Sequence, residues 1–151
     1  MWEGAIIINK FESPICELFE FTKLLNSKQN ELIPEGYGER CIYGTIINRC
    51  YYSSYNYTSE WLKNKYDFVP LKPHEFDNPK DYKSPHKQVQ NELTNHNKID
   101  VSNKLRSILI LRKEADYPPL NRLTLKQVNN CIADMEYIFK RLSRKDLGII
   151  D

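Results

Sequence analysis

Helical periodicity is the feature that most constrains the fold of this chain. Its apolar residues recur mostly three and four positions apart, and only five glycines occur among its 151 residues. Such spacing places apolar side chains along one face of an α-helix, whereas a half-buried strand needs them at alternate positions. The sequence therefore predicts an all-α fold.

Two long helices are expected in the first half of the chain. The first covers about residues 13–30 and opens on Ser13-Pro14, an N-cap residue followed by a proline suited to the first turn. The second runs from about Glu39 to about Lys65. Before them, residues 1–11 are compatible with either a short strand or the first turn of a leading helix.

Three further helices are expected after a proline-containing connection, residues 66–83. The third opens at Ser84-Pro85. The fourth begins near Asp100 and ends at Tyr117-Pro118-Pro119, because proline cannot continue a helix. The last has the clearest start signal, since residues 124–127 read Thr-Leu-Lys-Gln, a capping box.

Composition limits the function classes that the chain can belong to. The net charge of +2 is too close to zero to indicate nucleic-acid binding by itself. No apolar run approaches the roughly 20 residues that a membrane-spanning helix needs, and the N-terminal residues lack the basic leader of a signal peptide. We therefore expect a single domain over residues 1–151, in the cytoplasm and without a membrane partner.

The cysteines predict neither a metal site nor a cofactor site. Cys16, Cys41, Cys50 and Cys131 form no Cys-x-x-Cys motif and no Cys/His pair with zinc-site spacing. Cys41, Cys50 and Cys131 fall on or near apolar positions of the expected helices. We therefore expect them to be reduced residues of the core.

The stretch from residue 48 to residue 61 stands out within the second helix. It contains four of the ten tyrosines and one of the two tryptophans, with an arginine, Arg49, among them. At about 100° per residue, Arg49, Tyr52, Asn56 and Glu60 lie on one helical stripe. An arginine among aromatic side chains is costly to bury unless its charge meets a partner.

Arg49 has two interpretations on residue chemistry alone. It can be structural and paired with a carboxylate, for which Glu60 and Asp116 are the candidates. It can instead bind an anion, because the guanidinium offers a planar fork of donors that matches phosphate.

Arg112 and Asp116 are four residues apart at the end of the fourth helix, where we expect them to form a structural ion pair.

The three histidines are weak candidates for acid–base chemistry. His74 lies in the proline-containing connection, and His96 closes the third helix. His86 lies in the first turn of that helix, where the helix N-terminus lowers the pKa of an imidazole. The sequence contains no Gly-rich phosphate loop and no nucleophile elbow that would point to another catalytic centre.

Three motifs resemble those of HEPN-domain proteins (higher eukaryote and prokaryote nucleotide-binding). The segment Arg49-Cys-Tyr-Tyr-Ser-Ser-Tyr-Asn56 is similar to the family's Arg-Ala-Tyr-Tyr-Ala-x-Phe-His. Ser84-Pro-His86-Lys-x-Val89 resembles the small-residue-His-Lys-Gly-Val segment of one bacterial and archaeal group. Leu111-Arg112-x-x-Ala115-Asp116-Tyr117 resembles that group's Leu-Arg-x-x-Ala-Asp-Tyr. The motifs occur in the family's order and span about residues 12–143.

The resemblance implies an up-and-down bundle of four or five helices that forms a homodimer or pairs with another HEPN protomer. It also implies an RNA-directed activity in toxin–antitoxin or antiviral defence systems. In the ribonucleases of the family, which need no metal, an Arg and a His face a cleft between protomers. On this pattern Arg49, Tyr52 and Tyr57 are expected to bind RNA phosphate, and some HEPN toxins are adenylylated on a tyrosine at the position of Tyr57.

The chain departs from the family pattern at the catalytic position. Asn56 stands where the motif has His, and an amide cannot exchange a proton near pH 7. Losing a general base costs on the order of 10²–10⁴ in rate. RNA binding is thus the expectation, and cleavage would depend on Arg49 with Asn56 or His86. The alternative is a non-catalytic HEPN module that binds a protein partner, such as a minimal nucleotidyltransferase or an antitoxin.

Overall fold

The computed structural model describes residues 14–116 and 122–147, and all regular structure within these ranges is helical. The all-α prediction is therefore confirmed. In chain order the elements are α1 (Pro14–Ser27), α2 (Gln29–Leu32), α3 (Arg40–Tyr66), the short 3-10 helices η1 (Pro73–Glu75) and η2 (Pro79–Asp81), α4 (Pro85–Asn95), α5 (Ile99–Asp116), α6 (Leu125–Arg141) and the 3-10 helix η3 (Arg144–Leu147).

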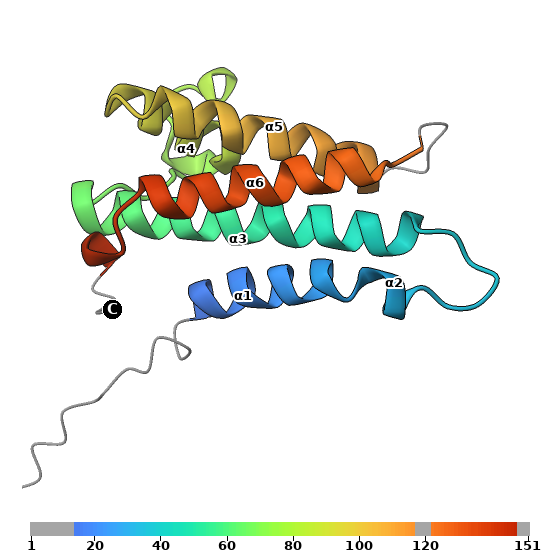
Figure 1. Ribbon diagram of the computed structural model, residues 1–151. Helices are drawn as coiled ribbons and strands as arrows, with labels where there is room; N and C mark the ends of the chain where they lie inside the picture. Colours follow the sequence, from blue (N-terminus) through green and yellow to red (C-terminus); the bar gives the residue numbers. More distant parts are fainter. Residues whose placement is uncertain (1–13, 117–121, 148–151) are drawn as a thin grey trace, which may run out of the picture.

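The long helices form a bundle in which consecutive long helices alternate in direction. Helices α1 and α5 run one way and α3 and α6 run the other, while the shorter α4 packs beside α5 (Figure 1). The expected helix from about Glu39 to Lys65 is α3. The segment 1–11 and the predicted stop at Tyr117-Pro118-Pro119 lie outside the described residues.

Helix ends follow the capping signals of the sequence. The Thr124 hydroxyl accepts a hydrogen bond from the Gln127 N–H (3.3 Å), and the Gln127 side chain accepts one from the Thr124 N–H (2.9 Å). The Ser84 hydroxyl likewise accepts from the N–H of Lys87 at 3.4 Å. At the C-terminal end of α3, Asp67 adopts a left-handed conformation (φ 55°), which ends the helix.

Helix α3 is the centre of the bundle, because α1, α4, α5 and α6 all pack on it. Its 27 residues carry the largest buried side chains, among them Tyr51, Tyr57 and Trp61, each at most 1% exposed. One cluster of buried residues joins the helices, and α6 contributes to it Val128, Cys131, Met135, Ile138 and Phe139. The aromatic stretch of the sequence is thus largely core.

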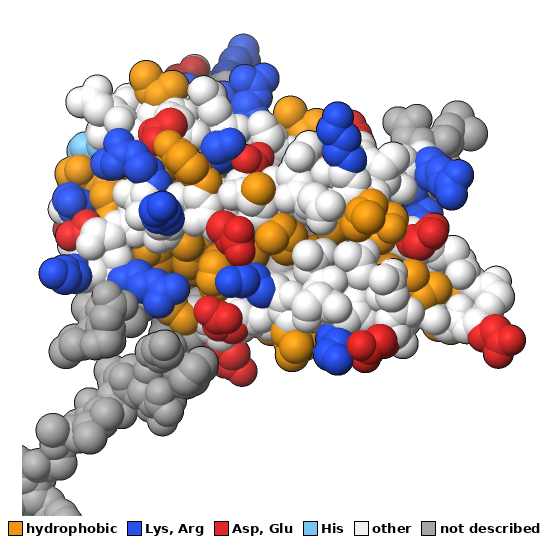
Figure 2. Space-filling view, in the orientation of Figure 1, with side chains coloured by type: hydrophobic (Ala, Val, Ile, Leu, Met, Phe, Trp, Pro, Cys, Tyr) orange, Lys and Arg blue, Asp and Glu red, His pale blue; other side chains and the backbone are white. Residues whose placement is uncertain are grey.

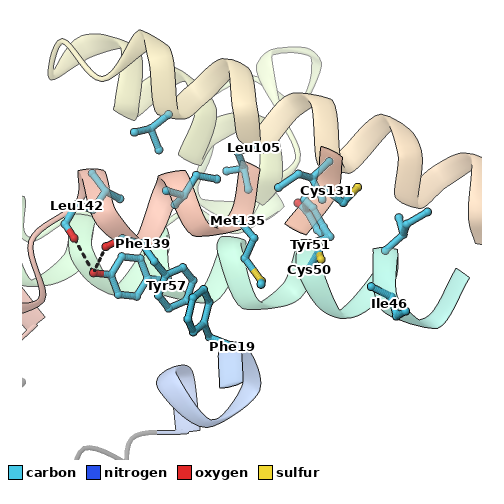
Figure 3. Packing of buried hydrophobic residues seen from close by; sticks show 14 of the residues in the cluster. Phe19, Ile46, Cys50, Tyr51, Tyr57, Leu105, Cys131, Met135, Phe139 and Leu142 are labelled. Atoms are coloured by element: carbon cyan, nitrogen blue, oxygen red, sulfur yellow. Dashed lines mark hydrogen bonds between the residues drawn. The ribbon is translucent and has the colours of Figure 1, made fainter. Parts of the chain in front are cut away.

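A stack of three rings closes the core between α1, α3 and α6. Phe139 lies between Phe19 and Tyr57, with ring centroids 4.2 Å and 3.9 Å away (Figure 3). The Tyr57 hydroxyl donates to the carbonyl oxygen of Leu142 at 2.6 Å and lies 3.3 Å from that of Phe139. Tyr57 therefore anchors the end of α6.

The cysteine prediction is right for two residues and wrong for the third. Cys50 and Cys131 are buried, and so is Cys16, whereas Cys41 is exposed on α3. Burial raises the pKa of the Cys131 thiol to about 12 and that of Cys50 further, so both stay protonated. Cys41 lies one position outside the buried face of α3. The apolar residues at the start of α3 are spaced too irregularly for the sequence to show this.

The connection between α3 and α4 is held down by one side chain. Gln88 accepts from the N–H of Leu71 (2.8 Å) and donates to the carbonyls of Leu71 (2.9 Å) and Lys83 (2.7 Å). These bonds fix the connection against α4.

None of the described helices combines the length and the apolar character needed to cross a membrane.

Candidate anion-binding site

Two arginines from different helices converge on one tyrosine ring. Tyr52 lies on α3, and the guanidinium carbon of Arg112, from α5, is 4.9 Å from its ring centroid. The guanidinium of Arg49, one turn before Tyr52, lies 5.9 Å from the same centroid. The packing of α5 against α3 thus brings together two motifs that are separated by more than 60 positions in the sequence.

A chain of hydrogen bonds links the two arginines through Asn48 and Asp116. Arg49 donates to the Asn48 side-chain oxygen at 2.8 Å, and the Asn48 amide donates to Asp116 at 3.3 Å. The second carboxylate oxygen of Asp116 accepts from the Arg112 Nε at 2.9 Å. The predicted Arg112–Asp116 ion pair is confirmed, and it also positions Arg49.

The site carries more positive charge than its carboxylate neutralises. Arg49 forms no direct ion pair with Asp116 or Glu60 in the described part of the chain, contrary to the structural pairing considered from the sequence. One carboxylate therefore serves two guanidinium groups. Like charges held close together repel, and an anion from outside the chain would relieve that repulsion.

An open hollow of about 720 Å³ adjoins these residues. It lies between the first half of α3 and the end of α5, and Arg49, Asn48 and Asp116 form one side of it. Its other lining residues are Tyr37, Gly38, Arg40, Cys41, Gly44, Thr45 and Ala115. A phosphate group in this hollow would meet Arg49 and Arg40 and would have Tyr37, which is 74% exposed, as an aromatic neighbour.

His86 lies on the other side of Arg112, against the aromatic face of α3. Its Nδ1 is hydrogen-bonded to the Tyr51 hydroxyl, and its ring packs on Tyr55 with centroids 4.7 Å apart. Burial lowers the pKa of His86, and the nearby charges of Arg112 and Lys113 lower it further. Where the Tyr51 hydroxyl donates this bond to a neutral imidazole, the proton of His86 is on Nε2, and His86 is then a hydrogen-bond donor beside Arg112.

The remaining predicted residues divide between surface and core. Asn56 is exposed on α3, two turns beyond Arg49 and nearly in line with it, as the stripe predicted. Tyr57 is fully buried, and its hydroxyl bonds to backbone carbonyls. We therefore remove Tyr57 from the RNA-binding residues, because a ligand does not reach its hydroxyl without opening the core.

Sequence reasoning missed Asn48 and the role of Tyr51. Asn48 carries the link between Arg49 and Asp116, and Tyr51 holds His86 and also lies 5.5 Å beneath the Arg112 guanidinium. A polar residue directly before Arg49 was the signal for Asn48. Tyr51 gave no separate signal, because periodicity identifies it only as a core residue.

Within residues 14–116 and 122–147, no group of three or more His, Cys, Asp or Glu side chains is placed to hold a metal ion. Comparison of the chain with protein-family models, with curated proteins and with solved structures found no match.

Proposed function

We propose that this chain is a HEPN-like protein that binds RNA through the phosphate backbone, with Arg49 as the principal contact. The observation that carries the proposal is the convergence of Arg49 and Arg112 on Tyr52 with only Asp116 between them. Arg112 is held by its ion pair, which leaves most of the Arg49 fork available to an anion. The surrounding tyrosines provide rings on which a base can stack.

The setting that the motifs support is a toxin–antitoxin or antiviral system, with a homodimer or a HEPN–HEPN pair as the active assembly. In such an assembly the Arg49–Asn56 stripe, which is half-buried at Arg49 and exposed at Asn56, would face the same stripe of a second protomer. Asn56 can orient a ribose hydroxyl or a phosphate oxygen. The proton transfers of cleavage would require His86, which is the titratable imidazole nearest to Arg112.

The test of binding is fluorescence anisotropy with a labelled single-stranded RNA of about 12 nucleotides, at two salt concentrations. We expect Arg49→Ala to weaken binding by about tenfold and to reduce the salt dependence of the binding constant, because a phosphate contact is lost. The matched control is Arg106→Ala, an exposed arginine of α5 outside the site. Equal affinity of wild type and Arg49→Ala would contradict the proposal.

The test of cleavage is incubation with RNA in the absence of metal, followed by analysis for 2′,3′-cyclic phosphate ends. We expect Asn56→His to raise the cleavage rate by at least tenfold, because it restores a proton-transferring group on the stripe. We expect Arg49→Ala to abolish that gain. If Asn56→His binds RNA like wild type but yields no cyclic phosphate, the HEPN-like geometry of the stripe is wrong.

A second candidate function is a non-catalytic HEPN module that binds a protein such as a minimal nucleotidyltransferase or an antitoxin. The observation that favours it is the outer face of α1, where Phe21 is 50% and Leu24 56% exposed beside a hollow of about 810 Å³. Co-expression with the product of a neighbouring gene would test it. Loss of co-purification in Phe21→Ser with Leu24→Ser, but not in Arg49→Ala, would support the second candidate.

A further inference from the structure

A second cluster of aromatic and basic side chains lies at the end of α3 opposite the hollow. The Tyr66 ring stacks on His96 with centroids 3.5 Å apart and an interplanar angle of 11°. Beneath them Trp61 is almost fully buried, and the ammonium groups of Lys65 and Lys98 lie 5.2 Å and 5.8 Å from its ring. We call this the α3-end surface, and it consists of Lys65, Tyr66, His96, Lys98, Arg144 and Lys145.

The fold fixes the position of these side chains. Asn97 takes a left-handed conformation (φ 57°), and the next N–H, that of Lys98, donates to the Leu93 carbonyl at 2.8 Å. Asp146 of η3 accepts hydrogen bonds from Trp61 Nε1 and Lys65 Nζ, each at 3.0 Å. The latter bonds hold η3, and with it Arg144 and Lys145, against the end of α3.

Positive charge exceeds negative charge on this surface. The Asp146 carboxylate pairs with Lys65. Glu92 is hydrogen-bonded to His96, whose ring is charged only when protonated, and Asp67 lies at the edge, directly after Tyr66. Among the described residues, Lys98, Arg144 and Lys145 form no ion pair. Figure 2 shows Lys and Arg side chains gathered at the left-hand end of the molecule, over the end of α3 and over η3.

We propose that the α3-end surface is a second contact for single-stranded RNA. A base extends the His96–Tyr66 stack on Tyr66, which is 37% exposed, and Lys98, Arg144 and Lys145 meet the flanking phosphates. Stacked rings beside a basic surface are the usual arrangement for strand binding without sequence preference. The inference takes RNA from the proposed function but does not depend on Arg49, which lies about 24 Å away along α3.

The experiment measures binding of the labelled 12-nucleotide RNA to wild type and to a double variant, Lys98→Glu with Lys145→Glu. We expect at least a tenfold loss of affinity. The slope of log K against log salt should fall by about 1.4, because each phosphate contact contributes about 0.7 for single strands. Tyr66→Leu should weaken binding severalfold with an unchanged slope, because stacking is not ionic.

The control is Lys126→Glu, an exposed lysine in the first turn of α6, which should bind as wild type does. The circular dichroism spectrum of each variant checks that the bundle is intact. Wild-type affinity in the double variant overturns the inference, even where Arg49→Ala weakens binding and so supports the proposed function. Weaker binding in the double variant with no effect of Arg49→Ala supports the α3-end surface and removes the Arg49 site.

A polyglutamate peptide serves as a competitor of another chemical class. We expect it to displace RNA poorly, because it offers no bases to stack on Tyr66. Displacement by polyglutamate at the same charge concentration, with the same sensitivity to the double variant, would overturn RNA as the ligand. Absence of any RNA binding by wild type would overturn both this inference and the proposed function.

Discussion

Single residues of this protein act through the partners that packing gives them. Arg49 and Arg112 are both arginines beside Tyr52, yet Arg112 bonds directly to a carboxylate and Arg49 reaches it only through Asn48. This difference leaves more of the Arg49 guanidinium without a carboxylate partner, which supports Arg49 as the proposed anion contact. His86 is likewise defined by its neighbours, since Tyr51 is hydrogen-bonded to its Nδ1 and Arg112 opposes its protonation.

The titration of His86 provides a prediction. Burial, Arg112 and Lys113 hold its pKa below the ordinary value of 6.5. The unfolded chain then binds a proton more readily than the folded one, so the unfolding free energy should decrease as pH falls through about 6.5 and level off below the folded pKa. NMR titration should show Arg112→Met raising the pKa of His86. The control Arg106→Met should leave it unchanged, and a His86 pKa above 6.5 in wild type would refute the argument.

The Tyr57 hydroxyl provides a second prediction at this scale. Tyr57→Phe leaves the Leu142 carbonyl without its buried donor, which should lower the unfolding free energy by about 1–3 kcal/mol in urea denaturation. The control is Tyr37→Phe, whose side chain is 74% exposed and which should unfold like wild type. An unchanged urea midpoint for Tyr57→Phe would contradict this prediction and would mean that the Leu142 carbonyl accepts a hydrogen bond from water in the variant.

At the scale of elements, α3 joins the core and the site in one helix. Its buried faces carry Tyr51, Tyr57 and Trp61, and the Arg49–Asn56 stripe emerges between them. Helix α5 completes the site from its C-terminal end, and α4 supplies His86 from its first turn. The position of each contributing side chain therefore depends on where its helix begins or ends.

Helix α6 allows this dependence on helix ends to be tested. Thr124→Ala removes the capping box and should lower stability by about 1 kcal/mol, because the N–H of Gln127 loses its acceptor. Thermal unfolding followed by circular dichroism measures the loss. Ser107→Ala, an exposed position within α5, is the matched control and should be neutral or slightly stabilising. A loss of equal size in both variants would exclude a capping effect.

At the scale of the whole molecule, one aromatic stack ties the first and last helices to α3. Phe139 contacts Phe19 on one side and Tyr57 on the other and is 5% exposed. Around it the bundle is continuous, with buried residues from every long helix in one cluster. The stability of the bundle should therefore depend strongly on this ring.

We expect Phe139→Ala to lower the unfolding free energy by about 3–5 kcal/mol, because it removes two ring contacts and leaves a cavity. Urea denaturation followed by tryptophan fluorescence and by circular dichroism measures the change. Phe21→Ala is the size-matched control, since Phe21 is 50% exposed on α1 and should lose far less. Similar losses of unfolding free energy in the two variants would contradict a central role of the Phe139 ring in the core.

The sequence by itself determined the long helices of this protein and the capping residues that begin α4 and α6. Local signals carried this information: the spacing of apolar residues, the Thr124–Gln127 box and the Ser84-Pro85 start depend only on neighbours in the chain. They also indicated Arg49, Asn56 and the Arg112–Asp116 pair. Spacing alone did not show that Tyr52 and Tyr57 have different environments. Tyr52 lies under two guanidinium groups, whereas Tyr57 is fully buried in the core.

Only the tertiary structure decided which of these residues meet. The bond from Asn48 to Asp116 and the contact between Tyr51 and His86 join positions 68 and 35 residues apart. The charge balance of the site depends on such contacts, because electrostatic interaction falls with distance in space and not with separation in sequence. The same holds for the α3-end surface, where Lys98 and Asp146 reach Trp61 from separate parts of the chain.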